Sequence, residues 1–145
     1  MFNRILMAFK FGTACEYALS KCAELAQTHD AELHIFHALD YRLKELDKND
    51  SKLREITEET NQRFEKELKP LLGDLKFISF NCKPADEALD VCRQAIQIDA
   101  DLIILGCHQH SDRKSLGRVD YVGSTIMEKA PCPVLLIPYS EKKRK

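Results

Sequence analysis

The feature that most constrains the fold is a regular alternation of short apolar segments with longer segments of helical periodicity. The apolar segments have the length of strands and lie at 3–9, 32–39, 75–80, 102–105 and 134–137. The helical patterns lie at 14–29, 51–72, after 86 to about 98, and from 123 onward. Strands that alternate with helices form a parallel sheet covered on both faces. We therefore predict an α/β fold, a three-layer sandwich whose five-stranded parallel sheet has the flavodoxin-like, doubly wound (Rossmann-like) order 3-2-1-4-5.

Local signals predict where the helices begin and which faces they bury. Thr13 with Glu16 three residues later is the pattern of a capping box. Ser51 is expected to cap the long second helix, and Pro70 to end or kink it. The apolar stripes expected to face the sheet are Tyr17, Ala18, Cys22, Leu25 and Ala26; Leu53, Ile56, Thr60, Phe64, Leu68 and Leu71; and Ala88, Leu89, Cys92, Ala95 and Ile96.

The composition indicates one domain of ordinary globular character. The chain has 145 residues and a net charge of −1, so no basic surface for nucleic acid or an anionic membrane is expected. No apolar run approaches the ~20 residues that cross a bilayer, and no signal-peptide pattern is present, so we expect a cytoplasmic protein. We expect a domain over 1–138 and a basic tail over 139–145 that is solvated, with a partner contact as the alternative.

The stretch from 101 to 138, DLIILGCHQHSDRKSLGRVDYVGSTIMEKAPCPVLLIP, is where function should be sought. It is predicted to form a strand that ends at Gly106, a polar loop, a short helix and a last strand. Open parallel sheets bind ligands at the carboxyl ends of their strands, where the strand order reverses. The segment Gly123-Ser124-Thr125 supplies a glycine, a hydroxyl and helix N–H groups that suit an anion, although a helix N-cap without a ligand has the same residues.

Residues at both ends of the chain resemble a known family. The opening NRILMAFKFGTACEYALSKCAELAQTHDAELHIFHALD, and the later segments DLIILGCHQH and GSTIMEKAPCPVLLIP, are similar to universal stress proteins. The middle of the chain shares only the order of elements, so the resemblance spans the whole chain and is most specific in the second half. It implies a stress-response module that is regulatory or protective.

The resemblance also implies a ligand, because one branch of the family binds ATP through a loop of the form G-x2-G-x9-G-S/T. The other branch, typified by universal stress protein A, lacks that loop. Here Gly106 matches the first glycine, and Gln109 stands at the position of the second. Thirteen residues, rather than nine, separate Gln109 from Gly123. Lys10 stands where the family has a nucleotide-contacting aspartate. The candidate residues for an adenine nucleotide (ATP or AMP) are Ala8, Lys10, Ala38, Gly106, His108, Gln109, Gly123, Ser124 and Thr125.

These departures have different physical consequences. Gln109 adds a side chain where the family's glycine lets backbone approach a phosphate. The longer loop adds little closure entropy, since each doubling of loop length costs ~0.6 kcal/mol. Lys10 only donates hydrogen bonds, whereas an aspartate accepts them from a ribose or an adenine amino group. Lys10 could instead neutralise an anion, or extend to solvent without a ligand.

The cysteines and histidines form no clear metal or redox pattern. The six cysteines contain no CxxC pair, so we expect free thiols. Cys107, His108 and His110 are zinc ligands by type, with His37 as a further candidate, but their spacing does not suit a compact site. No resolving cysteine accompanies Cys107. We expect no metal site and no redox role.

No catalytic set is evident either. Ser124, His108 and Asp120 could be combined as nucleophile, base and orienting group, but neither a GxSxG elbow nor a Walker lysine supports them. We therefore expect that the protein is not an enzyme. Three hypotheses remain: a module that binds an adenine nucleotide, a dimeric interaction protein without nucleotide, and a slow nucleotide hydrolase. The protein partner and the stress are not indicated by the sequence.

The last strand predicts a homodimer. The segment from Cys132 to Pro138 should lie at a sheet edge, and an exposed apolar edge strand favours pairing with another chain. Pro133 and Pro138 border it without interrupting its middle. The resemblance implies antiparallel pairing with a twofold-related copy through Cys132, Val134, Leu135, Leu136 and Ile137.

Overall fold

The computed structural model describes residues 1–108 and 121–140. Within these residues the chain forms one parallel sheet whose strands lie in the order β3-β2-β1-β4-β5, as predicted. The strands are β1 (Arg4–Ala8), β2 (Glu32–Leu39), β3 (Ile78–Pro84), β4 (Leu102–His108) and β5 (Val134–Tyr139). The order reverses between β1 and β4, the two strands that pair at the centre of the sheet.

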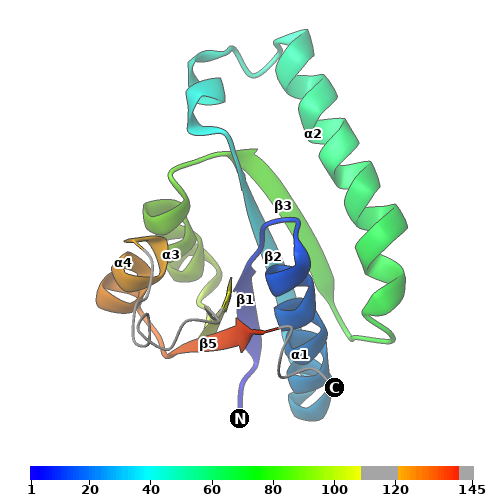
Figure 1. Ribbon diagram of the computed structural model, residues 1–145, viewed down its shortest axis with the longest axis vertical. Coiled ribbons are helices and arrows are strands. Elements are labelled where there is room, and N and C mark those ends of the chain that lie inside the picture. Colours follow the sequence, from blue (N-terminus) through cyan, green and yellow to red (C-terminus); the bar gives the residue numbers. More distant parts are fainter. Residues whose placement is uncertain (109–120, 141–145) are drawn as a thin grey trace.

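Helices cover both faces of the sheet, which confirms the three-layer α/β architecture (Figure 1). The helices α1 (Thr13–His29) and α2 (Ser51–Arg63) lie on one side, and α3 (Glu87–Ile98) and α4 (Tyr121–Lys129) on the other. A short 3-10 helix, η1 (Tyr41–Glu45), follows β2. The long helix continues from α2 through a π-helical turn over Phe64–Leu68 and a 3-10 turn over Lys69–Leu71.

Two apolar clusters hold the layers together. Alternate residues of β1 point to opposite faces, so Ile5 and Met7 join the α1 side while Leu6 joins the α3 side. All three side chains are fully buried. This double burial explains why the sequence of β1 is a continuous apolar run without polar alternation.

Two helix starts differ from the sequence prediction. The N-cap of α1 is Gly12, not Thr13, and its φ of 150° is a conformation that favours glycine. No side chain caps this end, so the predicted capping box is wrong; only the Gly12 carbonyl accepts the N–H of Glu16, at 3.0 Å. Asp50, not Ser51, caps α2, because its carboxylate accepts the N–H groups of the next turn.

The strands β3, β4 and β5 end later than predicted, and β3 also begins later, at Ile78 rather than Leu75. β3 runs to Pro84 because its pairing with β2 continues as far as Leu39, and an edge strand tolerates proline. β4 does not end at Gly106: Cys107 pairs with Pro138 and His108 pairs with Tyr139. The residues after Gly106 that were expected in a loop therefore begin as strand. Gln109 and His110 lie outside the described residues.

The buried stripes are only partly correct: in α1, Tyr17 and Leu25 are half-buried, and Leu19 and Ala23 are buried although they were not predicted. Ala18, Cys22 and Ala26 are buried as predicted. After the π-helical turn the helix presents Leu72 to the core and leaves Leu71 69% exposed, since the wider turn shifts the angular phase. In α3 the buried stripe is shifted. Val91 is buried although it was not predicted to be, while Leu89 and Ile96 are exposed.

Gly106 is required by the packing of α1 on β4. A Cβ atom at this position would lie 3.0 Å from the Ala18 Cβ, 3.1 Å from the Ala14 carbonyl oxygen and 3.2 Å from the Cys15 Cα. These distances are too short for ordinary van der Waals contact. The glycine therefore lets the helix approach the strand, with or without a ligand nearby.

Gly106→Ala should lower the free energy of unfolding by about 1–3 kcal/mol, because the added methyl group overpacks the contact between α1 and β4. Urea denaturation measures this change. Ala18→Gly should cost about 1 kcal/mol alone but restore part of the loss in the double variant, since it removes one of the three crowded atoms. Fully additive losses would contradict this contact as the cause.

Candidate functional site

The strand order places a crevice at the carboxyl ends of β1 and β4. A cavity of about 220 Å³ occupies it, bounded by the end of β1, the start of α1 and the end of β4. The free N–H groups at the start of α1 favour a negative charge at this end of the helix. The lining residues are Lys10, Phe11, Gly12, Ala14, Cys15, Gly106, Cys107 and His108.

The structure divides the predicted nucleotide residues between the two faces of the sheet. Lys10, Gly106 and His108 line the cavity on the α1 side. Ala8 and Ala38 pack on the opposite face, against the cluster formed by α3 and α4. Gln109 lies outside the described residues, as does Asp120.

The segment Gly123-Ser124-Thr125 lies within α4, near its start. Gly123 is buried and Ser124 is exposed. The Ser124 hydroxyl donates a hydrogen bond to the Tyr121 carbonyl at 3.2 Å. A hydroxyl held inside its own helix in this way needs no ligand to be satisfied, although its oxygen can still accept a hydrogen bond.

Lys10 does not simply extend into solvent. Its ammonium lies 3.2 Å from the Glu87 carboxylate, so the pair links the end of β1 to the first turn of α3 across the carboxyl edge of the sheet. The Lys10 side chain is 59% exposed and that of Glu87 is 23% exposed. The edge of the sheet thus carries a donor and a carboxylate acceptor side by side. The sequence showed only the lysine, because Glu87 is distant along the chain.

Cys15 is the only thiol in the cavity that comes from a helix. Burial raises the pKa of the Cys15 thiol above its usual value of 9.0, although backbone groups of Lys10 and Gly106 partly oppose that rise. The thiol is therefore protonated at neutral pH. A protonated thiol is a weak nucleophile, so Cys15 serves as a packing group in the cavity wall.

An aromatic cluster fixes the loop between β1 and α1. The His37 Nδ1–H donates to the Phe9 carbonyl, with 2.8 Å between the heavy atoms. The His37 ring meets the Phe11 ring edge to face at a centroid distance of 5.2 Å. On the other side of Phe11, the Arg63 guanidinium carbon lies 4.1 Å from the ring centroid, a cation–π contact from the end of α2. His37 therefore positions the loop that carries Lys10, a role that sequence analysis missed.

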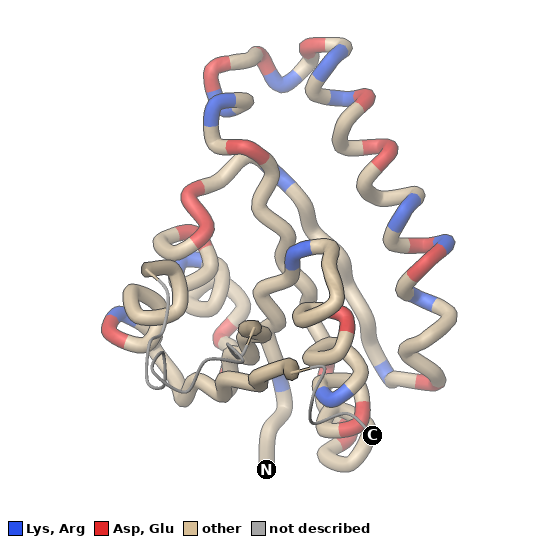
Figure 2. The backbone as a smooth tube through the Cα atoms, viewed as in Figure 1, with Lys and Arg blue, Asp and Glu red and all other residues tan. Residues whose placement is uncertain are grey.

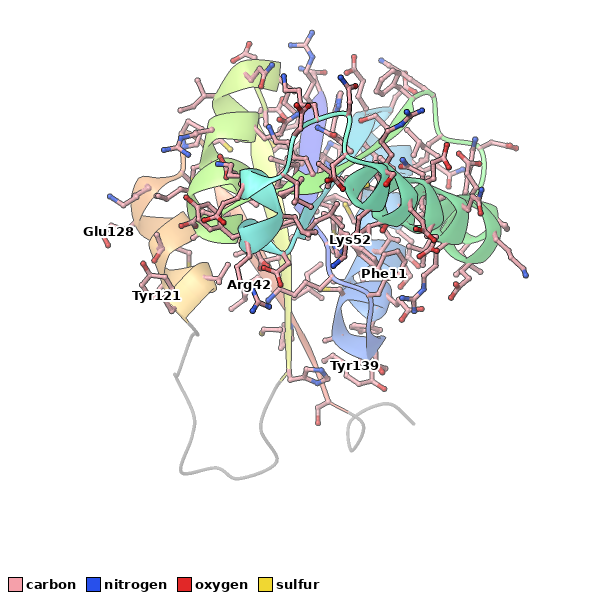
Figure 3. All side chains as sticks on the ribbon, turned by 90° about the horizontal axis from the view of Figure 1, so that it is seen from above. Phe11, Arg42, Lys52, Tyr121, Glu128 and Tyr139 are labelled. Carbon is pink, nitrogen blue, oxygen red and sulfur yellow. The ribbon has the colours of Figure 1, made fainter. Side chains whose placement is uncertain are left out.

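His108 ends β4 beside the aromatic residues of the edge strand. Its ring centroid lies 6.0 Å from that of Tyr139. Tyr139 is only 7% exposed and lies 5.5 Å from the Tyr17 ring of α1. Figure 3 shows Tyr139 at the same end of the molecule as Phe11, which lines the cavity. Phe11 and His108 are thus the ring side chains of the cavity wall, and rings of this kind can pack against a flat ligand.

A hydroxyl–imidazole–carboxylate chain lies elsewhere on the sheet. The Ser79 Oγ–H donates to His34 Nδ1 at 3.0 Å, and His34 Nε2–H donates to the Glu32 carboxylate at 2.9 Å. This is the order of groups in a nucleophilic triad. However, Glu32 begins β2, at the opposite end of the strands from the crevice, and none of the three residues lines the cavity. The three side chains therefore satisfy one another's hydrogen bonds beside the β3 edge of the sheet.

The hydrogen bond between His34 and Glu32 makes the free energy of unfolding depend on pH. The His34 hydrogen bond lowers the pKa of Glu32 below its usual value of 4.5. The stabilisation is therefore complete above pH 4.5 and is lost as the pH falls through the lower folded-state pKa. In urea denaturation, the wild type should lose its advantage over Glu32→Gln below pH 4.5. Ser79→Ala should keep that pH dependence, because the bond between His34 and Glu32 remains. Parallel profiles for wild type and Glu32→Gln would contradict the assignment.

Other site classes are not represented among the described residues. Residues 1–108 and 121–140 contain no group of three or more histidine, cysteine, aspartate or glutamate side chains that could hold a metal ion. In the same ranges, no helix is long and apolar enough to cross a membrane. All six cysteines are free thiols.

The chain belongs to the universal stress protein family. The model of that family matches residues 1–138. This match confirms the resemblance seen in the strand, loop and helix segments of the sequence. Among curated proteins, no sequence matches significantly.

Solved structures of other family members share the fold. The universal stress protein UspA from Lactobacillus plantarum has a TM-score of 0.71 at 19% identity, over 94% of this chain and 97% of that one. A universal stress protein in complex with cAMP has a TM-score of 0.62 at 16% identity, over 96% and 98%. A family protein from Arabidopsis thaliana with AMP bound has a TM-score of 0.59 at 14% identity, over 99% and 96%.

Proposed function

We propose that this universal stress protein binds an adenine nucleotide at the crevice between β1 and β4 and acts as a regulatory or protective module in the cytoplasmic stress response. The observation that carries the proposal is the Lys10–Glu87 pair at the carboxyl ends of the strands, where the strand order reverses between β1 and β4. Two proteins of similar fold carry an adenine nucleotide, cAMP in one and AMP in the other. The free thiols are consistent with a reducing compartment.

In this proposal the pair of Lys10 and Glu87 replaces the family's aspartate. The Glu87 carboxylate accepts hydrogen bonds from ribose hydroxyls or the adenine amino group. The Lys10 ammonium holds that carboxylate in place at 3.2 Å and adds positive charge near the phosphates. Ala8 and Ala38 have small side chains, which leave room for a flat base beside the sheet edge.

The phosphates would lie at the start of α4. Gly123 and Ser124 lie near that end of the helix, where N–H groups and the helix dipole favour an anion. Gly106 contributes indirectly, because it sets the distance between β4 and α1. The module binds and responds to the nucleotide in this proposal, and no catalytic step is assigned to it.

Calorimetry with ATP and AMP tests the proposal. Glu87→Gln should weaken binding about tenfold or more, because a charged acceptor is worth ~1.5–3 kcal/mol in a hydrogen bond. Glu128→Gln is the matched control: Glu128 is exposed on α4 (Figure 3) and should leave the affinity unchanged. The proposal fails if no nucleotide is released from the purified, heat-denatured protein and millimolar ATP causes no shift in Tm.

A dimeric interaction module without nucleotide is the second candidate, because two site features are already satisfied without a ligand. Lys10 and Glu87 pair with each other, and Gly106 is required by helix packing alone. In this candidate the functional surface is the edge strand β5. An unidentified protein partner would then be recognised by the dimer.

The edge strand supports a homodimer in either candidate. β5 ends the sheet, and Leu135 on it is 42% exposed. Exposed backbone groups and an apolar side chain on an edge favour pairing with a second copy. Pro138 lies inside β5 and has no N–H to donate, so the paired segment would be centred on Val134–Ile137.

Leu135→Lys should convert the dimer to a monomer, because a charged side chain on an edge strand opposes strand pairing. Light scattering coupled to size exclusion at micromolar concentration measures the mass. Leu71→Lys is a suitable control, since Leu71 is 69% exposed but lies on the 3-10 turn after α2. A monomeric wild type would contradict the homodimer.

A further inference from the structure

A second and larger cavity lies away from the crevice. It has a volume of about 450 Å³ and is enclosed by η1, the first half of α2 and the carboxyl end of β3. Figure 1 shows these elements together at one end of the molecule, where α2 extends beyond the sheet. The lining residues are Leu43, Lys44, Leu46, Lys48, Leu53, Arg54, Thr57, Glu58, Cys82, Lys83 and Pro84. None of them lines the crevice between β1 and β4.

The cavity exists because the first half of α2 packs loosely on the sheet. Its contacts with β3 include long hydrogen bonds from the Cys82 thiol to the Thr57 carbonyl at 4.0 Å and to the Asn61 side chain at 3.8 Å. None of the residues of α2 between Ser51 and Arg63 is buried. The helix is anchored further on, by Phe64 and Leu68, which are buried against the sheet. The apolar stripe of the first half, including Leu53, is therefore only half-buried.

The floor of the cavity is apolar and its polar groups are already satisfied. The leucines Leu43, Leu46 and Leu53 are only half-buried, so a ligand could remove more of their surface from water. The Thr57 hydroxyl donates to the Leu53 carbonyl at 2.8 Å. Burial raises the pKa of the Cys82 thiol, so it is uncharged. Such a floor suits a hydrocarbon chain and offers few partners to a sugar or a nucleobase.

The rim has the opposite character, with four cations against one carboxylate, although the whole chain has a net charge of −1. The Lys44 ammonium lies 3.9 Å from the Asp90 carboxylate, which offsets part of its positive charge. In the part of the chain that the structure describes, Lys48, Arg54 and Lys83 have no carboxylate within 4.0 Å. This local excess of positive charge attracts an anionic group to the mouth of the cavity.

We infer that this cavity binds a small amphiphilic anion, an unbranched alkyl carboxylate whose chain lies among the three leucines and whose head group meets the basic rim. The volume falls in the range of ~300–1,000 Å³ that is usual for small-molecule pockets. Basic and acidic positions alternate along α2 (Figure 2), so the excess of cations belongs to the rim of the cavity and not to the helix as a whole. The inference does not rest on nucleotide binding.

Decanoate is the first probe, used with the full chain below its micelle concentration. Calorimetry should show one site per chain, and octanoate should bind about tenfold more weakly, because two methylene groups are lost at ~0.8 kcal/mol each. Decan-1-ol and decyltrimethylammonium have the same tail with no charge and the opposite charge, and both should bind more weakly. Higher salt should weaken decanoate binding.

Variants test the two parts of the cavity. The double substitution Lys48→Ala with Arg54→Ala should reduce decanoate affinity at least about fivefold through lost charge. Leu53→Asn should also reduce decanoate affinity, because it places a polar amide in the apolar floor of the cavity. Lys52→Ala is the matched control, because Lys52 is exposed on the same helix and does not line the cavity (Figure 3). Thermal unfolding of each variant checks that it is folded.

Three outcomes would overturn the inference. The first is the absence of decanoate binding, or equal binding of decyltrimethylammonium. The second is displacement of decanoate by saturating ATP in wild type and Glu87→Gln alike, which would place both ligands in one site. The third is self-association of the wild type that Leu46→Asp abolishes, which would identify a second copy as the occupant. Nucleotide binding can fail in all these experiments without affecting the result for decanoate.

Discussion

The contact between α1 and β4 at Gly106 determines most of the crevice. Three atoms of α1 crowd the position where Gly106 has no side chain, so any larger residue there would force the helix and the strand to shift apart slightly. This close approach sets where the first turn of α1 begins, and hence where its free N–H groups lie. A residue that matches a phosphate-loop glycine is thus explained by helix packing. The loop that carries Lys10 follows from the same contact, because it joins β1 to this helix.

Helices pack more tightly on one face of the sheet than on the other. On the α3 and α4 side, small residues such as Ala88 and Ala95 pack closely on the strands and are almost completely buried. On the α1 side, the buried side chains that anchor the long helix, Phe64 and Leu68, come after α2 itself, none of whose residues is buried. Its first half extends over η1 and leaves an apolar hollow with a basic rim. One sheet therefore supports a small crevice of mixed polarity and a larger, open apolar hollow at different places.

The sequence predicted the architecture because it depends on local periodicity and on the handedness of crossovers. All five strands and their order could be inferred from that pattern. The ends of elements were less predictable. Gly12 and Asp50 displace Thr13 and Ser51 as helix caps, since capping depends on which residue adopts the extended backbone before the first turn. The π-helical turn that brings Leu72 into the core has no simple sequence signal.

The candidate site was predictable only in part. The crevice follows from the strand order, so its location could be inferred. The partner of Lys10 could not, because Glu87 comes from another element and meets it only in the folded chain. The hydrogen bonds that join Ser79, His34 and Glu32 depend on the register of β2 against β3, which the sequence does not specify. The hollow beside α2 depends on a helix that leaves the sheet, which periodicity alone does not show.

The contact of Arg63 with Phe11 has a mechanical consequence. Arg63 is the last residue of α2, and its guanidinium lies over a ring that lines the crevice, while Arg54 and Thr57 of the same helix line the hollow. One helical segment thus touches both spaces and is anchored by the buried pair Phe64 and Leu68. A ligand that binds one position of this segment more tightly than another would couple the two spaces, and thermodynamic linkage would make that coupling reciprocal.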